Sequence, residues 1–172
     1  SLDDAKWLDL TIDGADEFDP NLALIKGGGA ALLQEKIVAT ASDQMIVITD
    51  AGKEVAQLGS FPLPIEIIPF GWQTTKALVE EMLVSMDVLD RDVTLRMNGD
   101  KPLLTDEANY IFVLHLKRIG NPRQLSLVLN QIPGVVENGL FIDICDIVII
   151  GHGDGRVQVR DINAGTQTDD RI

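Results

Sequence analysis

KGGGAALLQEKIVATASDQMIVIT, residues 26–49, contains the pattern that indicates the class of fold. Three glycines at 27–29 interrupt regular structure, and residues 30–41 after them have the composition of a helix. Residues 45–49 form a continuous apolar run of strand length, typical of a parallel strand buried on both faces. The stretch therefore predicts a helix that leads into a buried parallel strand.

Two further strands extend this unit. Residues 7–12 indicate a strand that ends at Asp13, and residues 147–150 indicate another, closed by Gly151. A strand, helix and strand at this spacing predict a βαβ unit with a right-handed crossover. The helix at 30–41 is apolar nearly all round, so we expect it to be buried on most faces. The fold class that follows is α/β, with a parallel-sheet, Rossmann-like core.

The middle of the chain, residues 61–142, has a different pattern of apolar residues. After the Phe61-Pro62-Leu63-Pro64 linker, the pattern indicates strands and helices in the order β-α-β-β-α-β: a strand at 65–68, a helix at 72–86, strands at 93–97 and 110–117, a helix from 121 to about 132, and a strand at 135–142. This order is that of a ferredoxin-like split motif, an α+β unit. The sequence therefore predicts a ferredoxin-like domain inserted into the core.

The expected domain boundaries follow from these patterns. Residues 1–60 form the α/β core, 61–141 the ferredoxin-like insert, and 142–172 the return to the core with a polar tail. The tail after Arg160 is expected to fray.

Composition excludes several classes of protein. The net charge is −13, from 27 acidic and 14 basic residues, so the surface repels phosphate backbones and nucleic acid is not an expected partner. No apolar run approaches the roughly 20 residues of a membrane span. The start shows neither the basic nor the apolar region of a signal peptide, and the one cysteine, Cys145, lies in an apolar run. We therefore expect a reducing, cytoplasmic setting and no membrane partner.

Three polar features follow strands of the predicted core or precede its helix. They are Asp13-Gly14-Ala15-Asp16, Lys26-Gly27-Gly28-Gly29, and Lys53. Open parallel sheets bind ligands at the carboxyl ends of their strands, so we expect these features to meet at one edge. Glycine backbone and a helix N-terminus bind anions, although three glycines alone fit a tight turn equally well. No Gly-Lys-Ser/Thr follows, which excludes a Walker loop. Leu32 stands where a Rossmann fingerprint has its last glycine, so that motif is a poor match.

Metal sites find little support in the sequence. The acidic loop that starts at Asp13 lacks the spacing of a calcium loop, because Ala15 and Leu24 stand at its third and twelfth positions. A looser Mg²⁺ site stays open, but a solvated acidic turn is the favoured interpretation. His115 and His152 are isolated, and no His/Cys cluster indicates zinc. We therefore expect no metal and no cofactor.

Glu35 is the most informative single residue. Its helical neighbours Ala31, Leu32, Val38 and Ala39 are all apolar. The carboxylate either extends to solvent or lies in an apolar pocket with a raised pKa, as a general base near neutral pH requires. An ion pair with Lys36, or with a lysine of another element, is an equally good interpretation.

Four stretches resemble the A-type ribose-5-phosphate isomerases, and the resemblance extends to about Arg160. They are LDLTIDGADE at 8–17, KGGGAALLQEK at 26–36, GSFPLP at 59–64 and IPGVV at 132–136. The resemblance implies an α/β core with a ferredoxin-like lid that serves oligomerisation. It also implies a metal-free enzyme, a homodimer or homotetramer, that interconverts D-ribose 5-phosphate and D-ribulose 5-phosphate through a cis-enediolate in the non-oxidative pentose phosphate pathway.

The resemblance also assigns roles to residues. Glu35 would be the catalytic base, with Asp13, Asp16 and Lys26 assisting it. The substrate would be bound by residues 13–16, residues 26–29 and Lys53. We expect Lys53 at the phosphate and Lys26 nearer the sugar oxygens, although the sequence leaves the order of these two lysines open. Two other functions stay open: a non-catalytic sugar-phosphate sensor, which has no need of Glu35, and a Mg²⁺-dependent phosphohydrolase that uses the aspartates.

One departure from the family concerns the start of the chain. Family members begin with a helix and a Thr/Ser-rich phosphate loop before the strand at 7–12, whereas this sequence begins close to that strand. We therefore expect an N-terminally shortened form with little activity on its own.

Overall fold

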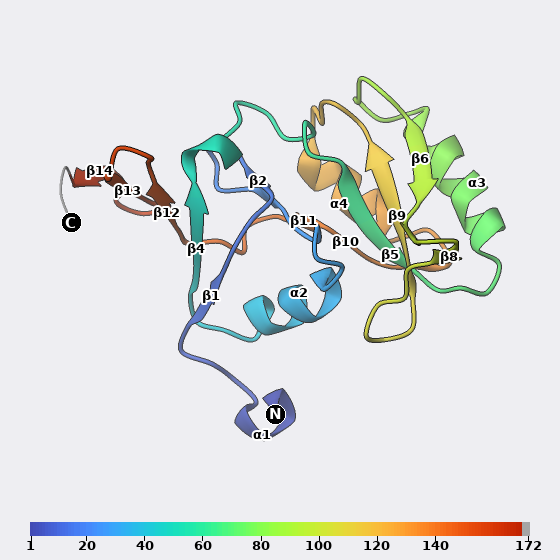
Figure 1. Cartoon of the computed structure of the whole chain (residues 1–172), viewed down its shortest axis with the longest axis horizontal. Coiled ribbons are helices and arrows are strands. Elements are labelled where there is room, and N and C mark those ends of the chain that lie inside the picture. The colour runs from blue at the N-terminus through green and yellow to red at the C-terminus, as the bar shows by residue number, and fades with distance from the viewer. Residues whose placement is uncertain (170–172) are drawn as a thin grey trace.

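The computed structural model describes residues 1–169. Four sheets and four α-helices form an elongated molecule, in which the five-stranded sheet and the four-stranded sheet lie at opposite ends (Figure 1). The strands are β1 (Thr11–Asp13), β2 (Glu17–Phe18), β3 (Leu24–Ile25), β4 (Met45–Asp50), β5 (Leu63–Ile67), β6 (Asp92–Leu95), β7 (Met97–Asn98), β8 (Lys101–Pro102), β9 (Tyr110–His115), β10 (Val135–Asn138), β11 (Leu140–Phe141), β12 (Ile147–Gly151), β13 (Val157–Asp161) and β14 (Gly165–Asp169). The helices are α1 (Leu2–Ala5), α2 (Leu32–Thr40), α3 (Trp72–Leu83) and α4 (Pro122–Leu129), with a 3₁₀ turn η1 (Ala51–Lys53).

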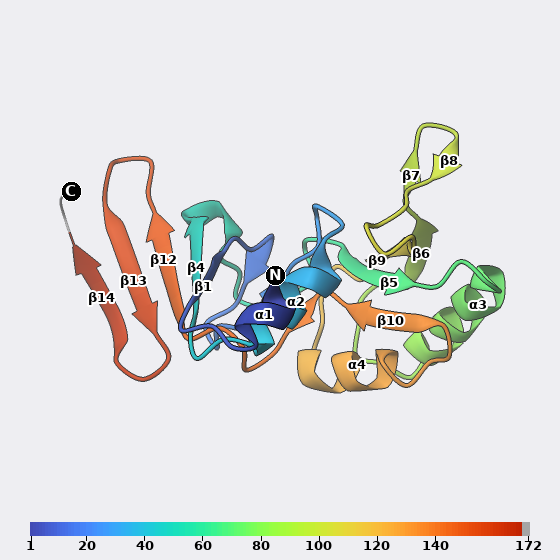
Figure 2. The ribbon, with the colours of Figure 1, turned by 90° about the horizontal axis from the view of Figure 1, so that it is seen from below.

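The predicted parallel core is confirmed. In the five-stranded sheet, of order β1-β4-β12-β13-β14, strands β1, β4 and β12 run parallel. Between β1 and β4 the chain forms the antiparallel pair β2 and β3, which the sequence did not predict, and then α2. The parallel strand β1 is shorter than expected, since only an isolated bridge between Leu8 and Ser42 precedes Thr11. The tail was expected to fray after Arg160, but β13 and β14 form an antiparallel hairpin there (Figure 2). The expectation for residues 170–172 lies outside the described part of the chain.

The core sheet is buried on one face only, so two expectations were wrong. In β4, Met45 and Val47 are buried against Phe18 and Phe141, whereas Ile48 is 54% exposed. In α2, Leu32 and Ala39 are buried, but Ile37 is 48% exposed. Strand periodicity explains the first difference, because alternate side chains point to opposite faces and nothing among residues 1–169 covers the second face.

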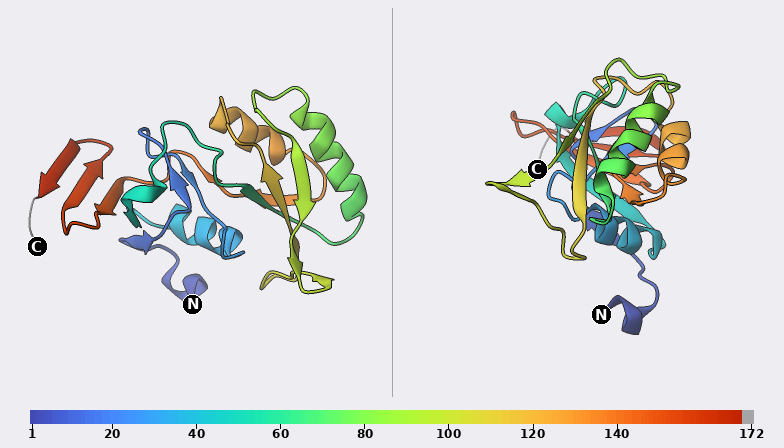
Figure 3. Two further views of the ribbon diagram at one scale, coloured as in Figure 1. Left: turned by 45° about the horizontal axis from the view of Figure 1, so that its top comes forward. Right: turned by 90° about the vertical axis from the view of Figure 1, so that its right-hand side faces the viewer.

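The insert has the predicted ferredoxin-like topology. Its antiparallel sheet has the order β10-β5-β9-β6, which is the order of a split βαββαβ motif, and α3 and α4 are its two helices (Figure 3). Asn121 caps α4 through its side chain, which accepts from the Gln124 N–H, and Pro122 is the first helical residue, as predicted. The apolar side chains of β5, β9, α3 and α4 form one core cluster.

The last strand of the insert differs from the single strand predicted at 135–142. It breaks at Gly139 into β10, which pairs with β5, and β11, which pairs with β3 in a small three-stranded sheet. A Cβ on Gly139 would lie 2.3 Å from the Lys26 carbonyl oxygen, so only glycine fits at this crossing. The division into residues 1–60, 61–141 and 142–172 stays a prediction. The close approach of Gly139 to Lys26 lies near the predicted boundary at residues 141 and 142.

Candidate active site

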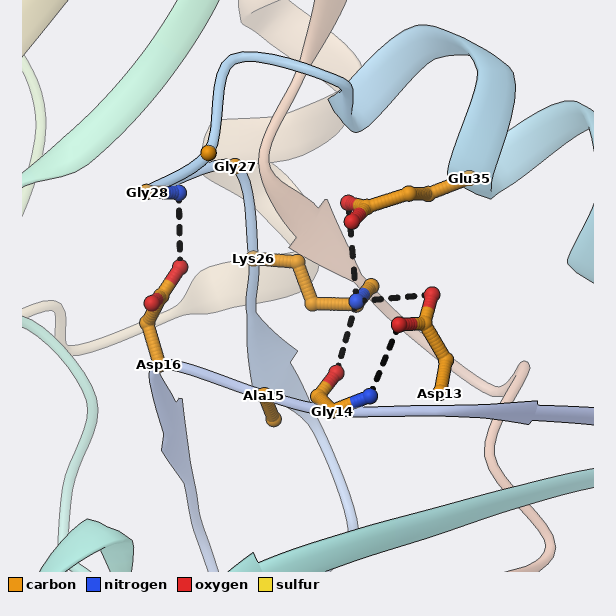
Figure 4. Close-up of a pocket in the computed structure, with 9 residues that line it drawn as sticks. Asp13, Gly14, Ala15, Asp16, Lys26, Gly27, Gly28 and Glu35 are labelled. Atoms are coloured by element: carbon orange, nitrogen blue, oxygen red, sulfur yellow. Dashed lines mark hydrogen bonds and ion pairs between the residues drawn. The ribbon is translucent and has the colours of Figure 1, made fainter.

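A polar cavity of about 210 Å³ opens where β1 and β3 end and α2 begins. The cavity is lined by Asp13, Gly14, Ala15, Asp16, Lys26, Gly27, Gly28, Gly29 and Glu35. Eight of these nine residues come from the two motifs singled out in the sequence, and the ninth is Glu35. The structure therefore brings the predicted aspartates, lysine, glycines and glutamate together (Figure 4).

Lys26 lies at the centre of the cluster. It follows β3, and its side chain is only 3% exposed. Its Nζ lies 2.9 Å from Asp13 Oδ2 and 3.5 Å from Glu35 Oε2, and it donates a hydrogen bond of 2.6 Å to the Gly14 carbonyl (Figure 4). An ammonium group this deeply buried needs such partners, because burial without them is costly. The cluster thus has one fixed positive charge between two carboxylates.

Glu35 projects from the first turn of α2 toward Lys26 (Figure 4). Its Oε2 atom is buried and has no hydrogen-bond partner among residues 1–169. Burial raises the pKa of Glu35; the neighbouring Lys26 charge opposes this rise, and the Asp13 carboxylate adds to it. Of the two interpretations left open by the sequence, both hold in part: the carboxylate is half-buried with a raised pKa, and its nearest cation is Lys26 rather than Lys36.

The two aspartates point in different directions. Asp13, at the end of β1, contacts Lys26 and accepts a hydrogen bond from the Gly14 N–H, whereas Asp16 accepts one of 2.8 Å from the Gly28 N–H. A Cβ on Gly28 would lie 2.6 Å from Asp16 Oδ1, so a glycine is needed for the loop to approach this close. No group of three or more His, Cys, Asp or Glu side chains suited to a metal ion occurs in the described part of the chain.

The loop that leads into α2 is built around unusual backbone conformations. Gly27 has a φ of +104°, and Ala30 has a φ of +67°, which delays the start of the helix to Leu32 rather than residue 30. No side-chain hydrogen bond caps this helix, which follows the glycine loop after two residues, and the first N–H groups of a helix have no partner within it. Such groups can donate to an anionic or polar ligand.

Lys53 and the histidines lie elsewhere. Lys53 ends η1, directly after β4, but is not among the residues that line the cavity. His115 contacts Thr94 in the insert, and His152 follows β12. The sequence reasoning missed Phe141, whose buried ring lies 5.5 Å from Lys26 Nζ. An apolar residue in an apolar stretch gives no signal of this contact.

Comparisons with known proteins agree with one another. The sequence model of the ribose 5-phosphate isomerase A (phosphoriboisomerase A) family matches residues 1–155. The ribose-5-phosphate isomerase A of Ruegeria pomeroyi is 75% identical over 172 residues, covering 100% of this chain and 66% of its own length. That of Cereibacter sphaeroides is 76% identical over 165 residues, covering 96% of this chain and 63% of its own length. The chain thus spans about two thirds of the length of these curated relatives.

Solved structures show the same likeness. A D-ribose-5-phosphate isomerase in complex with phospho-erythronic acid superposes with a TM-score of 0.84 at 44% identity, covering 94% of this chain and 68% of that one. The ribose 5-phosphate isomerase of Plasmodium falciparum gives a TM-score of 0.83 at 33% identity, covering 90% of this chain and 66% of that one. The fold class predicted from the sequence is confirmed by both. Together with the matching motifs, these likenesses show that the chain belongs to the ribose 5-phosphate isomerase A family.

Proposed function

We propose that the protein interconverts D-ribose 5-phosphate and D-ribulose 5-phosphate, with Glu35 as the base. The observation that supports this most is the half-buried Glu35 carboxylate, whose Oε2 has no hydrogen-bond partner among residues 1–169 and lies 3.5 Å from Lys26 Nζ. A carboxylate with a raised pKa, whose nearest cation is the Lys26 ammonium group at 3.5 Å, is suited to accept a proton near neutral pH.

The proposed reaction moves one proton between adjacent carbons. Glu35 takes the proton from C2 of the open-chain aldose, which leaves a cis-enediolate, and returns it to C1, while the hydroxyl proton passes from O2 to O1, to give the ketose. One carboxylate can serve both carbons because they are neighbours. The enediolate oxygens need positive charge or N–H donors, which Lys26 and the loop of Gly27, Gly28 and Gly29 can supply. Asp13 and Asp16 would provide the acid-base help that opening of the furanose ring requires.

The substrate class is also a proposal. The related isomerase in complex with phospho-erythronic acid holds a phosphorylated sugar acid, which supports a sugar phosphate here. We assign Lys53 to the phosphate group and the cavity of residues 13–16 and 26–29 to the sugar. The position of Lys53 after β4, next to β1 in the sheet, puts it at the same sheet edge as Asp13.

Two alternatives carry less support. A sugar-phosphate sensor would not require a base, yet Glu35 is aimed at the cavity centre (Figure 4). A phosphohydrolase would use the aspartates together on a metal ion, whereas Asp13 faces Lys26 and Asp16 faces the Gly28 N–H. We therefore propose a reaction that needs no metal or cofactor.

The setting follows from the proposed activity. No helix in residues 1–169 is long and apolar enough to cross a membrane. We propose a cytoplasmic homodimer or homotetramer in the non-oxidative pentose phosphate pathway. Cys145 is buried, and burial raises the pKa of its thiol to about 12, so this thiol is expected to be unreactive.

The test of the proposed function is conversion rather than binding. The whole protein is mixed with ribose 5-phosphate, and formation of ribulose 5-phosphate is followed at several substrate concentrations. We expect saturable turnover. Tight binding of ribose 5-phosphate without conversion would favour the sensor and overturn the proposal.

A further inference from the structure

A second buried polar cluster lies beside α2, at its contact with the insert. Lys36 follows Glu35 directly in the chain, but its side chain points to β10 of the insert. Its Nζ donates hydrogen bonds of 2.8 Å to Glu137 Oε1 and 2.5 Å to the Asn138 carbonyl, and its side chain is 12% exposed. Neighbouring residues on one short helix thus connect to the cavity and to the insert. Figure 2 shows α2 beside β10 at this junction.

The acceptors of Lys36 are themselves held in place. Asn138 is fully buried; its amide donates to the Ser126 carbonyl and to Asn130 Oδ1, and its side-chain oxygen accepts from the Leu140 N–H. Asn130 in turn donates to Glu137 Oε1. These partners belong to α4 and to the β10–β11 segment, so Lys36 ties α2 to a fixed part of the insert.

Each charge of the Lys36–Glu137 pair depends on the other. Burial lowers the pKa of Lys36, and the Glu137 carboxylate opposes that shift. Burial alone would raise the pKa of Glu137, but the hydrogen bonds and charge of Lys36 hold it below its usual value. Breaking a buried pair by removing one partner leaves an uncompensated charge, which is strongly destabilising at that point. Lys36 and Glu137 are therefore expected to stay paired.

Phe141 connects this cluster to the active site. Its fully buried ring lies 4.9 Å from Lys36 Nζ and 5.5 Å from Lys26 Nζ. A cation within about 6 Å of an aromatic ring is attracted to it. The ring on β11 therefore lies within reach of both Lys26 in the cavity and Lys36 on α2.

α2 has few other polar restraints. The helix has nine residues and no side-chain cap, its buried side chains are the apolar Leu32 and Ala39, and Gln34 donates a hydrogen bond to Glu107 of the insert. Helices this short are not stable by themselves and depend on contacts with the rest of the fold. The Lys36 cluster is thus a main polar anchor of the helix that carries Glu35.

We propose that Lys36 is a positioning residue, which holds α2 at the rotation that places Glu35 against Lys26. This inference rests on the proposed function. A carboxylate about 6 Å from the helix axis moves by about 2 Å when the helix turns by about 20°. Misplacement of a reacting group by about 1 Å can cost on the order of 100-fold in rate. A small rotation of α2 is therefore enough to move the Glu35 carboxylate out of position and slow the reaction.

The test compares Lys36→Met with Lys76→Met in the whole protein. Lys76 is a matched control, because it also pairs with a glutamate, Glu80 at 2.7 Å, but on the surface of α3. Lys36→Met should lower kcat by about 10- to 100-fold with KM within about twofold, since the residues proposed to bind the sugar stay in place. Lys76→Met should leave both constants unchanged.

A pH profile separates positioning from general loss of stability. Burial is the largest cause of the raised pKa of Glu35, so a looser α2 that lets water reach the carboxylate should move the acid limb of kcat/KM to lower pH. If Lys36→Met does not fold, Glu137→Gln is used instead; it keeps the side-chain volume and should give the same changes in milder form. A folded variant with unchanged kcat and acid limb would refute the inference. A wild-type protein without turnover would instead refute the proposed function, and this inference with it.

Discussion

Substitution of Gly28 by alanine should impair the site without unfolding the protein. A Cβ at this position would lie 2.6 Å from Asp16 Oδ1 and 3.0 Å from Asp16 Cγ, closer than real Cβ atoms approach. The carboxylate of Asp16 has to move, and its 2.8 Å hydrogen bond from the Gly28 N–H is lost or distorted. Because the side chain that gives way is short and lies in an open cavity, the melting temperature should change little.

The expected size follows from that hydrogen bond. A hydrogen bond to a charged group contributes about 1.5–3 kcal/mol. If Asp16 must be held in place for ring opening and for binding the sugar, this loss corresponds to a decrease in kcat/KM of about 10- to 150-fold. The assay is formation of ribulose 5-phosphate by the whole protein, with thermal melting measured in parallel.

Gly153→Ala is the matched control, since Gly153 lies in the turn between β12 and β13, is not among the residues that line the cavity, and a Cβ on it would meet nothing within 4 Å. It should be nearly as active as the wild type. A double-mutant cycle makes the reasoning sharper: in an Asp16→Ala background, Gly28→Ala should cost little more, because its effect acts through Asp16. Equal activity of the two glycine variants, or full additivity in the cycle, would refute the reasoning.

Three further outcomes are expected. Only the ionised form of Glu35 can accept a proton, and burial raises its pKa above the ordinary value of 4.5, so kcat/KM should fall as the pH drops, with a midpoint above 4.5; a midpoint at or below that value would contradict the burial argument. Turnover should persist after exhaustive chelation with EDTA, whereas loss of turnover that Mg²⁺ restores would favour the phosphohydrolase chemistry. Light scattering of the whole protein at micromolar concentration should give the mass of a dimer or larger, and a clean monomer would count against the proposed assembly.

Much of the fold follows from local patterns. The strands β4 and β12 were predicted within a residue or two, because uninterrupted apolar runs bounded by Gly and Asp leave few alternatives. The order of strands and helices in the insert followed from alternation, helical spacing and the Asn121-Pro122 cap. What failed needed information from distant residues: the break at Gly139 depends on the approach of the Lys26 carbonyl, and the exposure of Ile37 depends on what lies against α2.

The site was predictable in membership but not in detail. The motifs named Asp13, Asp16, Lys26 and Glu35, and the topology of a parallel sheet brought them to one edge. Which carboxylate faces Lys26 could not be predicted, since that depends on the turn at residues 14–16 and on the rotation of α2. The pairing of Lys36 with Glu137, about a hundred residues apart, was also beyond sequence reasoning, because nothing local in either segment indicates the other.

The central claim, that Glu35 is the base of an aldose–ketose isomerase, is tested most directly by Glu35→Gln in the whole protein. The amide keeps the shape of the side chain but cannot take up a proton near neutral pH. Formation of ribulose 5-phosphate from ribose 5-phosphate should fall at least ~100-fold in kcat, with KM little changed. Near-normal turnover in a correctly folded Glu35→Gln protein would contradict the account.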